Sequence, residues 1–291
     1  MTGAQVEPRP SPIPYSNGLG STWGLKATNV LSDGSRRWTG RGIRIAILDS
    51  GVDLAHPDLE ARIVEARSFV PGCAPQDDVG HGTHCAGTAA GSSDPKGRRY
   101  GIACGAGICA GRVLDEAGRT EAANVIAGVE WAVSLDCHVI SMSIGTSDKE
   151  QSAEFEAAGR RALDAGCLVI AAAGNSAART VGQPANAESI MAVGAVDNWL
   201  RVARFSAGES PHADVPSPDI VAPGVNVYST APGRMYAFRE GTSMAAAHVA
   251  GIAALWAEAE GLRGRALWQR LLTSARALPA GSASARLAMA P

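Results

Sequence analysis

The sequence lacks a strong charge of either sign and lacks long apolar runs. Its 26 basic and 28 acidic residues leave a formal net charge of −2, which argues against a nucleic-acid-binding or membrane-surface protein. No uninterrupted apolar run reaches the roughly 18 residues that a membrane span needs. The 291 residues are 46% hydrophobic and 19% charged, a composition typical of a globular protein with one large domain.

The N-terminus lacks the apolar core of a signal peptide. Every second residue from 8 to 14 is a proline, which favours an extended, non-helical segment. We expect residues 1–22 to be an N-terminal extension, with a disordered tail as the alternative, and residues 23–291 to be the folded domain. The missing signal favours a cytoplasmic location, unless the chain is a trimmed form of a secreted protein.

The chain contains no CxxC pair, which argues against a zinc ribbon or a thioredoxin-like redox motif. Six cysteines allow 15 disulfide pairings. Three of the six lie in or beside apolar, strand-like runs, where a free cysteine behaves as a small hydrophobe. We expect mostly reduced thiols, which fits a reducing compartment. The six are Cys73, Cys85, Cys104, Cys109, Cys137 and Cys167.

Short apolar runs alternate along the chain with longer helical segments. This order predicts a three-layer α/β fold, in which helices cover both faces of a mostly parallel β-sheet. The expected strands are 43–48, 108–114, 137–142, 167–172, 190–196 and 219–221. The expected helices begin near residues 81, 121, 149, 242 and 265, the third running to Ala165 and the second being capped by Thr120.

A serine stands at the start of a long run of small apolar residues near the C-terminus. Thr242 or Ser243 begins a predicted buried helix, where free N–H groups and the positive end of the helix dipole converge. Such a position suits a nucleophile whose attack creates an oxyanion. The alternative is that Ser243 only caps the helix.

Other reactive side chains are expected at the same edge of the sheet. Asp49 and the segments 143–145 and 173–175 follow predicted strands, and His81 begins a second small-residue helix. The carboxyl ends of parallel strands meet at one edge. An acid, an imidazole, a hydroxyl and an amide donor brought together there are the groups that acyl transfer requires.

Four segments resemble the signatures of the subtilisin-like serine proteases, the subtilases. They are Asp49-Ser50-Gly51, His81-Gly82-Thr83-His84-Cys85-Ala86-Gly87, Ala171-Ala172-Ala173-Gly174-Asn175 and Gly241-Thr242-Ser243-Met244-Ala245. Their order, acid then histidine then serine, is also that of the family. The resemblance covers the chain from about Trp23 to the C-terminus and implies a serine endopeptidase that acts on proteins or peptides.

The resemblance implies a role for each matching residue. Ser243 resembles the nucleophile, His81 the general base and acid, and Asp49 the residue that orients the histidine. Asn175 resembles the side-chain donor to the oxyanion, helped by the backbone N–H of Ser243. The chemistry of this family requires no cofactor.

The resemblance also places a substrate cleft in which peptide binds as an added β-strand. Small residues leave the pocket before the scissile bond open to a sizeable apolar side chain, and Arg119 favours acidic or polar groups further upstream. The expected cleft residues are Gly118, Arg119, Thr120, Ser143, Ile144, Gly145, Ala172, Ala173 and Gly174.

Several residues have a second interpretation. His81 and His84 have a weak metal-ligand spacing, although His84 and His248 are expected to be packed structural residues. Asp58 stands where some relatives bind a structural calcium ion, with a plain turn acid as the alternative. Cys85 follows the proteinase K pattern of a thiol beneath the catalytic histidine, with packing as the alternative.

The chain departs from the family pattern at two places. Ala247 replaces a proline that usually follows the nucleophile by four residues, without loss of a catalytic group. Residues 13–15 weakly resemble the segment that blocks the cleft of intracellular subtilisins. Two alternative functions remain open, a narrow processing protease and a catalytically silent peptide-binding scaffold. The sequence leaves metal sites and oligomeric state undetermined.

Overall fold

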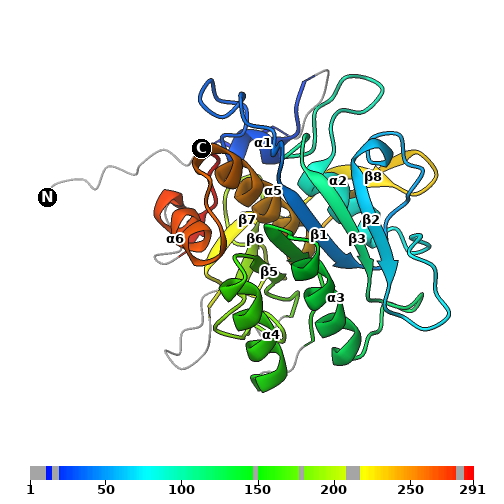
Figure 1. The fold of residues 1–291 in the computed structure, drawn as a ribbon. Coiled ribbons are helices and arrows are strands. Elements are labelled where there is room, and N and C mark those ends of the chain that lie inside the picture. The colour runs from blue at the N-terminus through cyan, green and yellow to red at the C-terminus, as the bar shows by residue number, and fades with distance from the viewer. Residues whose placement is uncertain (1–10, 15–19, 147–149, 177–179, 208–216, 280–284) are drawn as a thin grey trace, which may run out of the picture.

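A nine-stranded β-sheet runs through the molecule in the computed structural model (Figure 1), which describes residues 11–14, 20–146, 150–176, 180–207, 217–279 and 285–291. Neighbouring strands from β2 to β11 pair in parallel, and only β10 pairs antiparallel with β11. In spatial order the strands are β10 (Arg276–Ala277), β11 (Arg286–Leu287), β7 (Ile220–Pro223), β6 (Met191–Val196), β5 (Leu168–Ala172), β4 (Val139–Met142), β1 (Arg44–Asp49), β3 (Gly107–Arg112) and β2 (Ile63–Ser68).

Helices cover both faces of the sheet, so the predicted three-layer α/β fold is confirmed (Figure 1). One face packs against α2 (His81–Ala90), α5 (Thr242–Glu260) and α6 (Gly264–Ser274). The other packs against α3 (Ala122–Ser134) and α4 (Ala153–Asp164). None of the helices in the described residues is long and apolar enough to cross a membrane.

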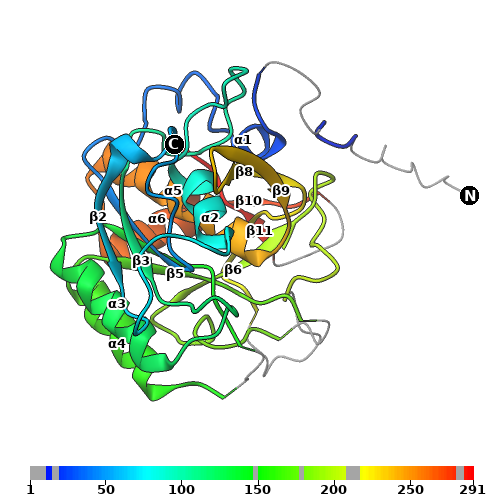
Figure 2. The same cartoon turned by 90° about the vertical axis from the view of Figure 1, so that its right-hand side faces the viewer.

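Several elements have no counterpart among the predicted ones. Three of them are the strands β2, β10 and β11. The others are the short helix α1 (Trp23–Ala27), a 3₁₀ turn (Glu60–Arg62) and the hairpin of β8 (Val227–Ala231) and β9 (Met235–Arg239). Figure 2 shows this hairpin lying over α2. Its strands are short and partly exposed, so their apolar pattern is too weak to predict them.

The helix that carries Ser243 begins two residues earlier than a Ser243 cap would require, at Thr242 instead of Met244. Gly241 is the residue that precedes α5, with φ at 148°, and no side chain caps the helix there. Only glycine adopts this backbone conformation readily. The capping interpretation of Ser243 is therefore wrong, because Ser243 is the second helical residue. The helix continues through the buried Ala247 without a break.

Two other helix boundaries differ from the prediction. Glu121, not Thr120, precedes α3, and its side chain accepts no capping hydrogen bond. The Thr120 hydroxyl instead donates to the carbonyl of Glu121. Helix α4 begins at Ala153, where the Ser152 hydroxyl accepts from the N–H of Phe155. Lys149, the predicted start, lies outside the described residues.

The described part of the N-terminal extension lies against the sheet domain. The N–H of Ile13 donates to the carbonyl of Asn198 at 2.8 Å, and the Asn198 side chain donates to the carbonyl of Ile13 at 3.0 Å. Ile13 also packs against the small core around Trp23 and Leu287. Tyr15 lies outside the described residues.

Candidate active site

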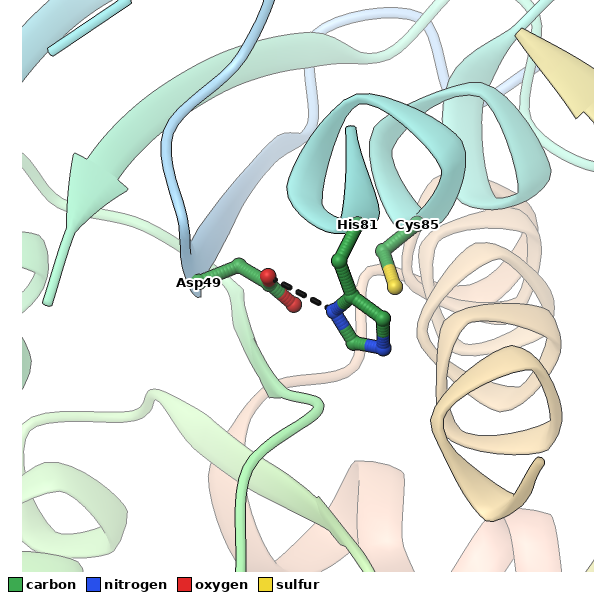
Figure 3. A group of neighbouring side chains, drawn as sticks. All are labelled: Asp49, His81 and Cys85. Atoms are coloured by element: carbon green, nitrogen blue, oxygen red, sulfur yellow. Dashed lines mark hydrogen bonds and ion pairs between the residues drawn. The ribbon is translucent and has the colours of Figure 1, made fainter. Parts of the chain in front are cut away.

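Asp49 and His81 are joined by a hydrogen bond at the carboxyl edge of the sheet (Figure 3). The distance from Asp49 Oδ1 to His81 Nδ1 is 2.8 Å. The Asp49 side chain is fully buried and that of His81 is 25% exposed. Gly82 lets helix α2 approach β1, because a Cβ there would collide with the carbonyl of Gly51. The bond to Asp49 fixes Nδ1 as the protonated nitrogen and leaves Nε2 as the basic one.

The charge of Asp49 is the largest influence on His81. It raises the pKa of His81 above its usual value of 6.5, while burial and the positive charge of Arg239 act in the opposite direction. Asp77 adds a smaller upward contribution. The imidazolium form of His81 is therefore stabilised, as a general base needs when it takes up a proton.

A second buried acid, Asp77, ties the two elements of this pair together. Its Oδ1 accepts from the hydroxyl of Ser50 at 2.9 Å and from the N–H groups of Val79 and Gly80. Its Oδ2 accepts both the N–H and the hydroxyl of Thr83. Asp77 thereby joins the end of β1 to the start of α2.

Ser243 lies in the same cleft as His81 and is almost buried, with 8% of its surface exposed. Its hydroxyl donates to the carbonyl of Ser143 at 3.2 Å, and the Ser143 hydroxyl donates to the carbonyl of Ser243 at 3.0 Å. This reciprocal pair holds the start of α5 against the segment that follows β4.

Asn175 stands beside the start of α5. Its Oδ1 accepts from both the N–H and the hydroxyl of Thr242, each at 2.9 Å. The Thr242 hydroxyl also accepts the N–H of Gly174 at 3.1 Å. These bonds occupy the side-chain oxygen of Asn175, so the amide Nδ2 remains as the donor of this side chain.

One large cleft contains most of the expected site residues. Its volume is about 830 Å³, and its lining includes His81, Asn175 and Ser243. Eight of the nine expected substrate residues also line it: Gly118, Arg119, Thr120, Ser143, Ile144, Gly145, Ala172 and Gly174. Ala173 does not, because its side chain is fully buried in the core that packs against α3 and α4. The Ala173 side chain thus faces away from the cleft, because side chains alternate between the two faces of an extended segment, and a role of Ala173 in binding substrate stays a prediction.

Sequence reasoning missed several cleft residues. Leu114, Val125 and Phe155 give the cleft apolar walls, and Arg239 brings a second cation. Val125 and Phe155 belong to helices, where their apolar character had indicated only core packing. Arg239 lies on an unpredicted strand.

Two other histidines, His84 and His248, have structural roles. His84 Nε2 lies 3.0 Å from the carbonyl of Val227 and 3.2 Å from that of Ala237, and burial lowers its pKa to about 3. His248 Nδ1 lies 2.8 Å from the carbonyl of Met244, and burial lowers its pKa to about 4. Both are packed residues, as expected.

No zinc-like cluster includes His84. Within the described residues, one group of three His, Cys, Asp or Glu side chains has metal-ligand spacing, and it consists of Asp49, His81 and Cys85. Nδ1 of His81 is already occupied by Asp49. The metal interpretation of His81 and His84 is therefore not supported. All six cysteines are free in the structure.

Comparison with known proteins agrees with this geometry. The model of the subtilase family matches residues 40–288. Subtilisin BL of Lederbergia lenta is 42% identical over 237 residues, a match that covers 80% of this chain and 82% of the relative. M-protease of Shouchella clausii is 42% identical over 237 residues, covering 80% of this chain but only 58% of the relative. The chain thus spans less than two thirds of the length of M-protease.

A solved structure gives the same result. A cold adapted subtilisin-like serine proteinase is 30% identical, with a TM-score of 0.80, and the match covers 95% of this chain and 99% of that one. The fold, the family model and these relatives agree over nearly the whole described domain. The chain therefore belongs to the subtilase family of serine endopeptidases.

Proposed function

We propose that this protein cleaves peptide bonds through an acyl-enzyme, with Ser243, His81 and Asp49 as its catalytic triad. The 2.8 Å bond between Asp49 and His81, in the cleft that also contains Ser243, is the observation on which the proposal rests. The Ser243 hydroxyl bonds the Ser143 carbonyl in this structure, and we propose that it turns toward His81 when substrate binds. Hydrogen bonds at catalytic residues commonly tighten only when substrate is bound.

In the first step, Ser243 Oγ attacks the scissile carbonyl carbon while His81 Nε2 takes the hydroxyl proton. Asp49 stabilises the imidazolium that forms. The tetrahedral intermediate collapses, the C–N bond breaks and His81 gives its proton to the leaving amine. Water then attacks the acyl-enzyme with His81 again as base, releasing the acid product and free Ser243. No cofactor enters these steps.

The negative charge on the intermediate needs donors that are already in place. We propose that Asn175 Nδ2 and the backbone N–H of Ser243 supply them. The support is that Asn175 Oδ1 is held by Thr242, which leaves the amide nitrogen free to donate. The N–H of Ser243 lies in the first turn of α5, where backbone donors have no partner within the helix.

The lining supports an apolar side chain in the residue before the scissile bond. Ile144, Phe155 and Ala172 contribute to the walls, and Gly174 leaves space. Arg119 also lines the cleft, but it pairs with Asp115 at 3.3 Å and its side chain is 79% exposed. We therefore propose only a weak preference for acidic or polar groups upstream. Cleavage of matched peptides that differ only in Glu or Lys upstream tests this preference, and equal cleavage rates would refute it.

A fluorophosphonate probe tests the proposed nucleophile directly. We expect the wild type to be labelled and Ser243→Ala to be unlabelled. Ser176→Ala is the matched control, because Ser176 also lines the cleft and its loss should preserve labelling. Labelling of Ser243→Ala at the wild-type rate would refute the role of Ser243. Binding of peptides by an unlabelled wild type would instead support the silent scaffold.

The breadth of specificity requires a separate measurement. Digestion of a proteome-derived peptide library, read by mass spectrometry, distinguishes a general protease from a narrow processing enzyme. A cleft of about 830 Å³ with mostly apolar walls supports broad cleavage. Cleavage confined to one sequence class would favour the processing enzyme.

Asp58 gives no support to a calcium ion. Its Oδ2 accepts the hydroxyls of Tyr100 at 2.6 Å and Tyr236 at 2.9 Å. These two hydrogen bonds stabilise the negative charge of the Asp58 carboxylate without a bound cation. We propose that Asp58 stabilises the fold through these two tyrosines, so that any effect of EDTA on the melting temperature is the same in Asp58→Asn as in the wild type. An EDTA effect that calcium reverses in the wild type and that is lost in Asp58→Asn would restore the calcium assignment.

The chain divides into an N-terminal extension and a peptidase domain in our proposal. We propose a peptidase domain over residues 23–291, since α1 begins at Trp23 and packs in the fold, and an extension over residues 1–22. The bond between Ile13 and Asn198, two residues that are not among those lining the cleft, supports an extension that lies against the domain. The alkaline proteases among the relatives do not favour a cytoplasmic location over a secreted one.

A further inference from the structure

The charge of the cleft is carried by arginine side chains. Among its described lining residues are two arginines, Arg119 and Arg239, and no aspartate or glutamate. A cleft with this lining attracts acidic groups and disfavours basic ones. The two arginines differ, however, in their partners and in their place along the cleft.

Arg239 has no carboxylate partner among the residues that the structure describes, whereas Arg119 is paired with Asp115. Arg239 lies on β9, half-buried, and its Nη2 donates to the carbonyl of Val79 across 3.4 Å. That single long bond to a neutral oxygen leaves the positive charge uncompensated. A guanidinium has five N–H donors in a fixed planar arrangement suited to a carboxylate.

Arg239 lies on the His81 side of the cleft. A Cβ added to Gly80, the residue before His81, would be 3.1 Å from Arg239 Nη2. The substrate walls formed by residues 118–120 and 143–145 come from the loops after β3 and β4 instead. Arg239 therefore faces a part of the substrate different from the part that those walls hold.

The chemistry identifies that part of the substrate. His81 gives its proton to the leaving amine, so the leaving peptide lies beside His81 while the acyl part remains on Ser243. An extended peptide advances about 3.3 Å per residue. The arginine next to Gly80 therefore reaches the first or second residue after the scissile bond. One exposed apolar side chain lines the cleft beside it, Val79 at 36% exposure.

We propose that Arg239 selects an acidic side chain at the first or second residue on the leaving side of the scissile bond. This inference rests on the proposed endopeptidase function. The carboxylate of the substrate takes the place of the ion-pair partner that Arg239 lacks, and the aliphatic part of the leaving residue packs on Val79.

Paired fluorogenic peptides test the proposal. They share one upstream sequence and differ only in Glu or Lys at the first or second leaving position, and the measured quantity is the ratio of kcat/KM for Glu over Lys. We expect a ratio of about fivefold or more in the wild type at low salt, decreasing at high salt. Arg239→Gln should bring the ratio near one, Arg239→Glu should invert it and Arg239→Lys should largely keep it.

Arg119→Gln is the matched control. It should leave the leaving-side ratio unchanged and alter only the ratio measured with Glu or Lys upstream. A wild-type leaving-side ratio of one, or a ratio that survives in Arg239→Gln, would overturn the role of Arg239 while peptide cleavage continues. Absence of both cleavage and fluorophosphonate labelling would instead overturn the endopeptidase itself, so the two failures are distinguishable.

Discussion

Thr242 donates two hydrogen bonds to the side-chain oxygen of Asn175, one from its N–H and one from its hydroxyl, each at 2.9 Å. The backbone N–H of Thr242 is only a donor, so the atom that it contacts must be the amide oxygen. This assigns which atom of the Asn175 amide is the oxygen and leaves Nδ2 as the donor. The residue next to the proposed nucleophile thus positions the proposed oxyanion donor.

Removing this donor should lower kcat with little change in KM. Loss of one side-chain oxyanion donor lowers kcat by about 10² to 10³-fold, a magnitude known from subtilisin itself. We expect that loss in Asn175→Leu. Thr242→Val removes only the hydroxyl anchor and should lower kcat less, whereas Thr242→Ser should stay near the wild type. Steady-state kinetics on one peptide measures all three, and an Asn175→Leu enzyme with unchanged kcat would contradict the assignment.

Replacing Asp77 should reduce both stability and activity. In Asp77→Asn, an NH₂ group replaces one of the two carboxylate oxygens. On either the Ser50 side or the Thr83 side, groups that donated to that oxygen then face another donor and lose their hydrogen bonds. Leaving a buried donor without a partner costs about 1–3 kcal/mol. We expect the free energy of unfolding to fall by about 2–4 kcal/mol for the several donors involved.

Activity should separate this effect from simple destabilisation. Asp77 joins β1 to α2, so a shift there moves His81 relative to Asp49, and we expect kcat to fall even at temperatures where the variant is fully folded. Asp164→Asn, at the exposed end of α4, is the control and should change neither quantity. Wild-type kcat in folded Asp77→Asn would exclude a positioning role.

The four motifs predicted much of this site because each motif is local in the sequence. Asp49 ends a strand, His81 and Ser243 begin or nearly begin helices, and Asn175 follows another strand. Parallel topology then brings such positions to one edge. The family resemblance supplied the roles that local patterns alone left open, as the capping interpretation of Ser243 shows.

The unpredicted features depend on partners that are distant along the chain. Asp77 is bonded to Ser50, 27 residues away, and Arg239 contacts Val79, 160 residues away. Neither residue belongs to an apolar pattern that indicates its neighbours. Ala173 was assigned to the cleft with its neighbours, and only its direction in the folded chain shows that it faces the core.

The pH profile should reflect the raised pKa of His81. His81 must be neutral to take the proton from Ser243, so kcat/KM should decrease as pH falls through a midpoint above 6.5. Asp49 and Asp77 raise this pKa and Arg239 lowers it. Arg239→Gln should therefore move the acid midpoint upward, whereas Arg119→Gln should not. A downward movement in Arg239→Gln would contradict the electrostatic role assigned to Arg239.

Cys85 gives a last prediction because its thiol lies against the proposed catalytic pair. The ligand atoms of Cys85, Asp49 and His81 are all within 4.8 Å of one another (Figure 3). Burial, followed by the negative charge of Asp49, raises the pKa of the Cys85 thiol. Little thiolate is then present near neutral pH, and we expect slow modification by thiol reagents.

A mercurial bound at Cys85 adds a bulky atom where the interior has no space, and it should displace His81 and abolish activity. Half-buried Cys73 is the control, because it should react sooner without inhibition. Cys85→Ala should remain active and resist the mercurial. Mass spectrometry of modified Cys85 against residual activity measures the effect; full activity after complete Cys85 modification would show that the thiol only packs, and that His81 tolerates a displaced neighbour.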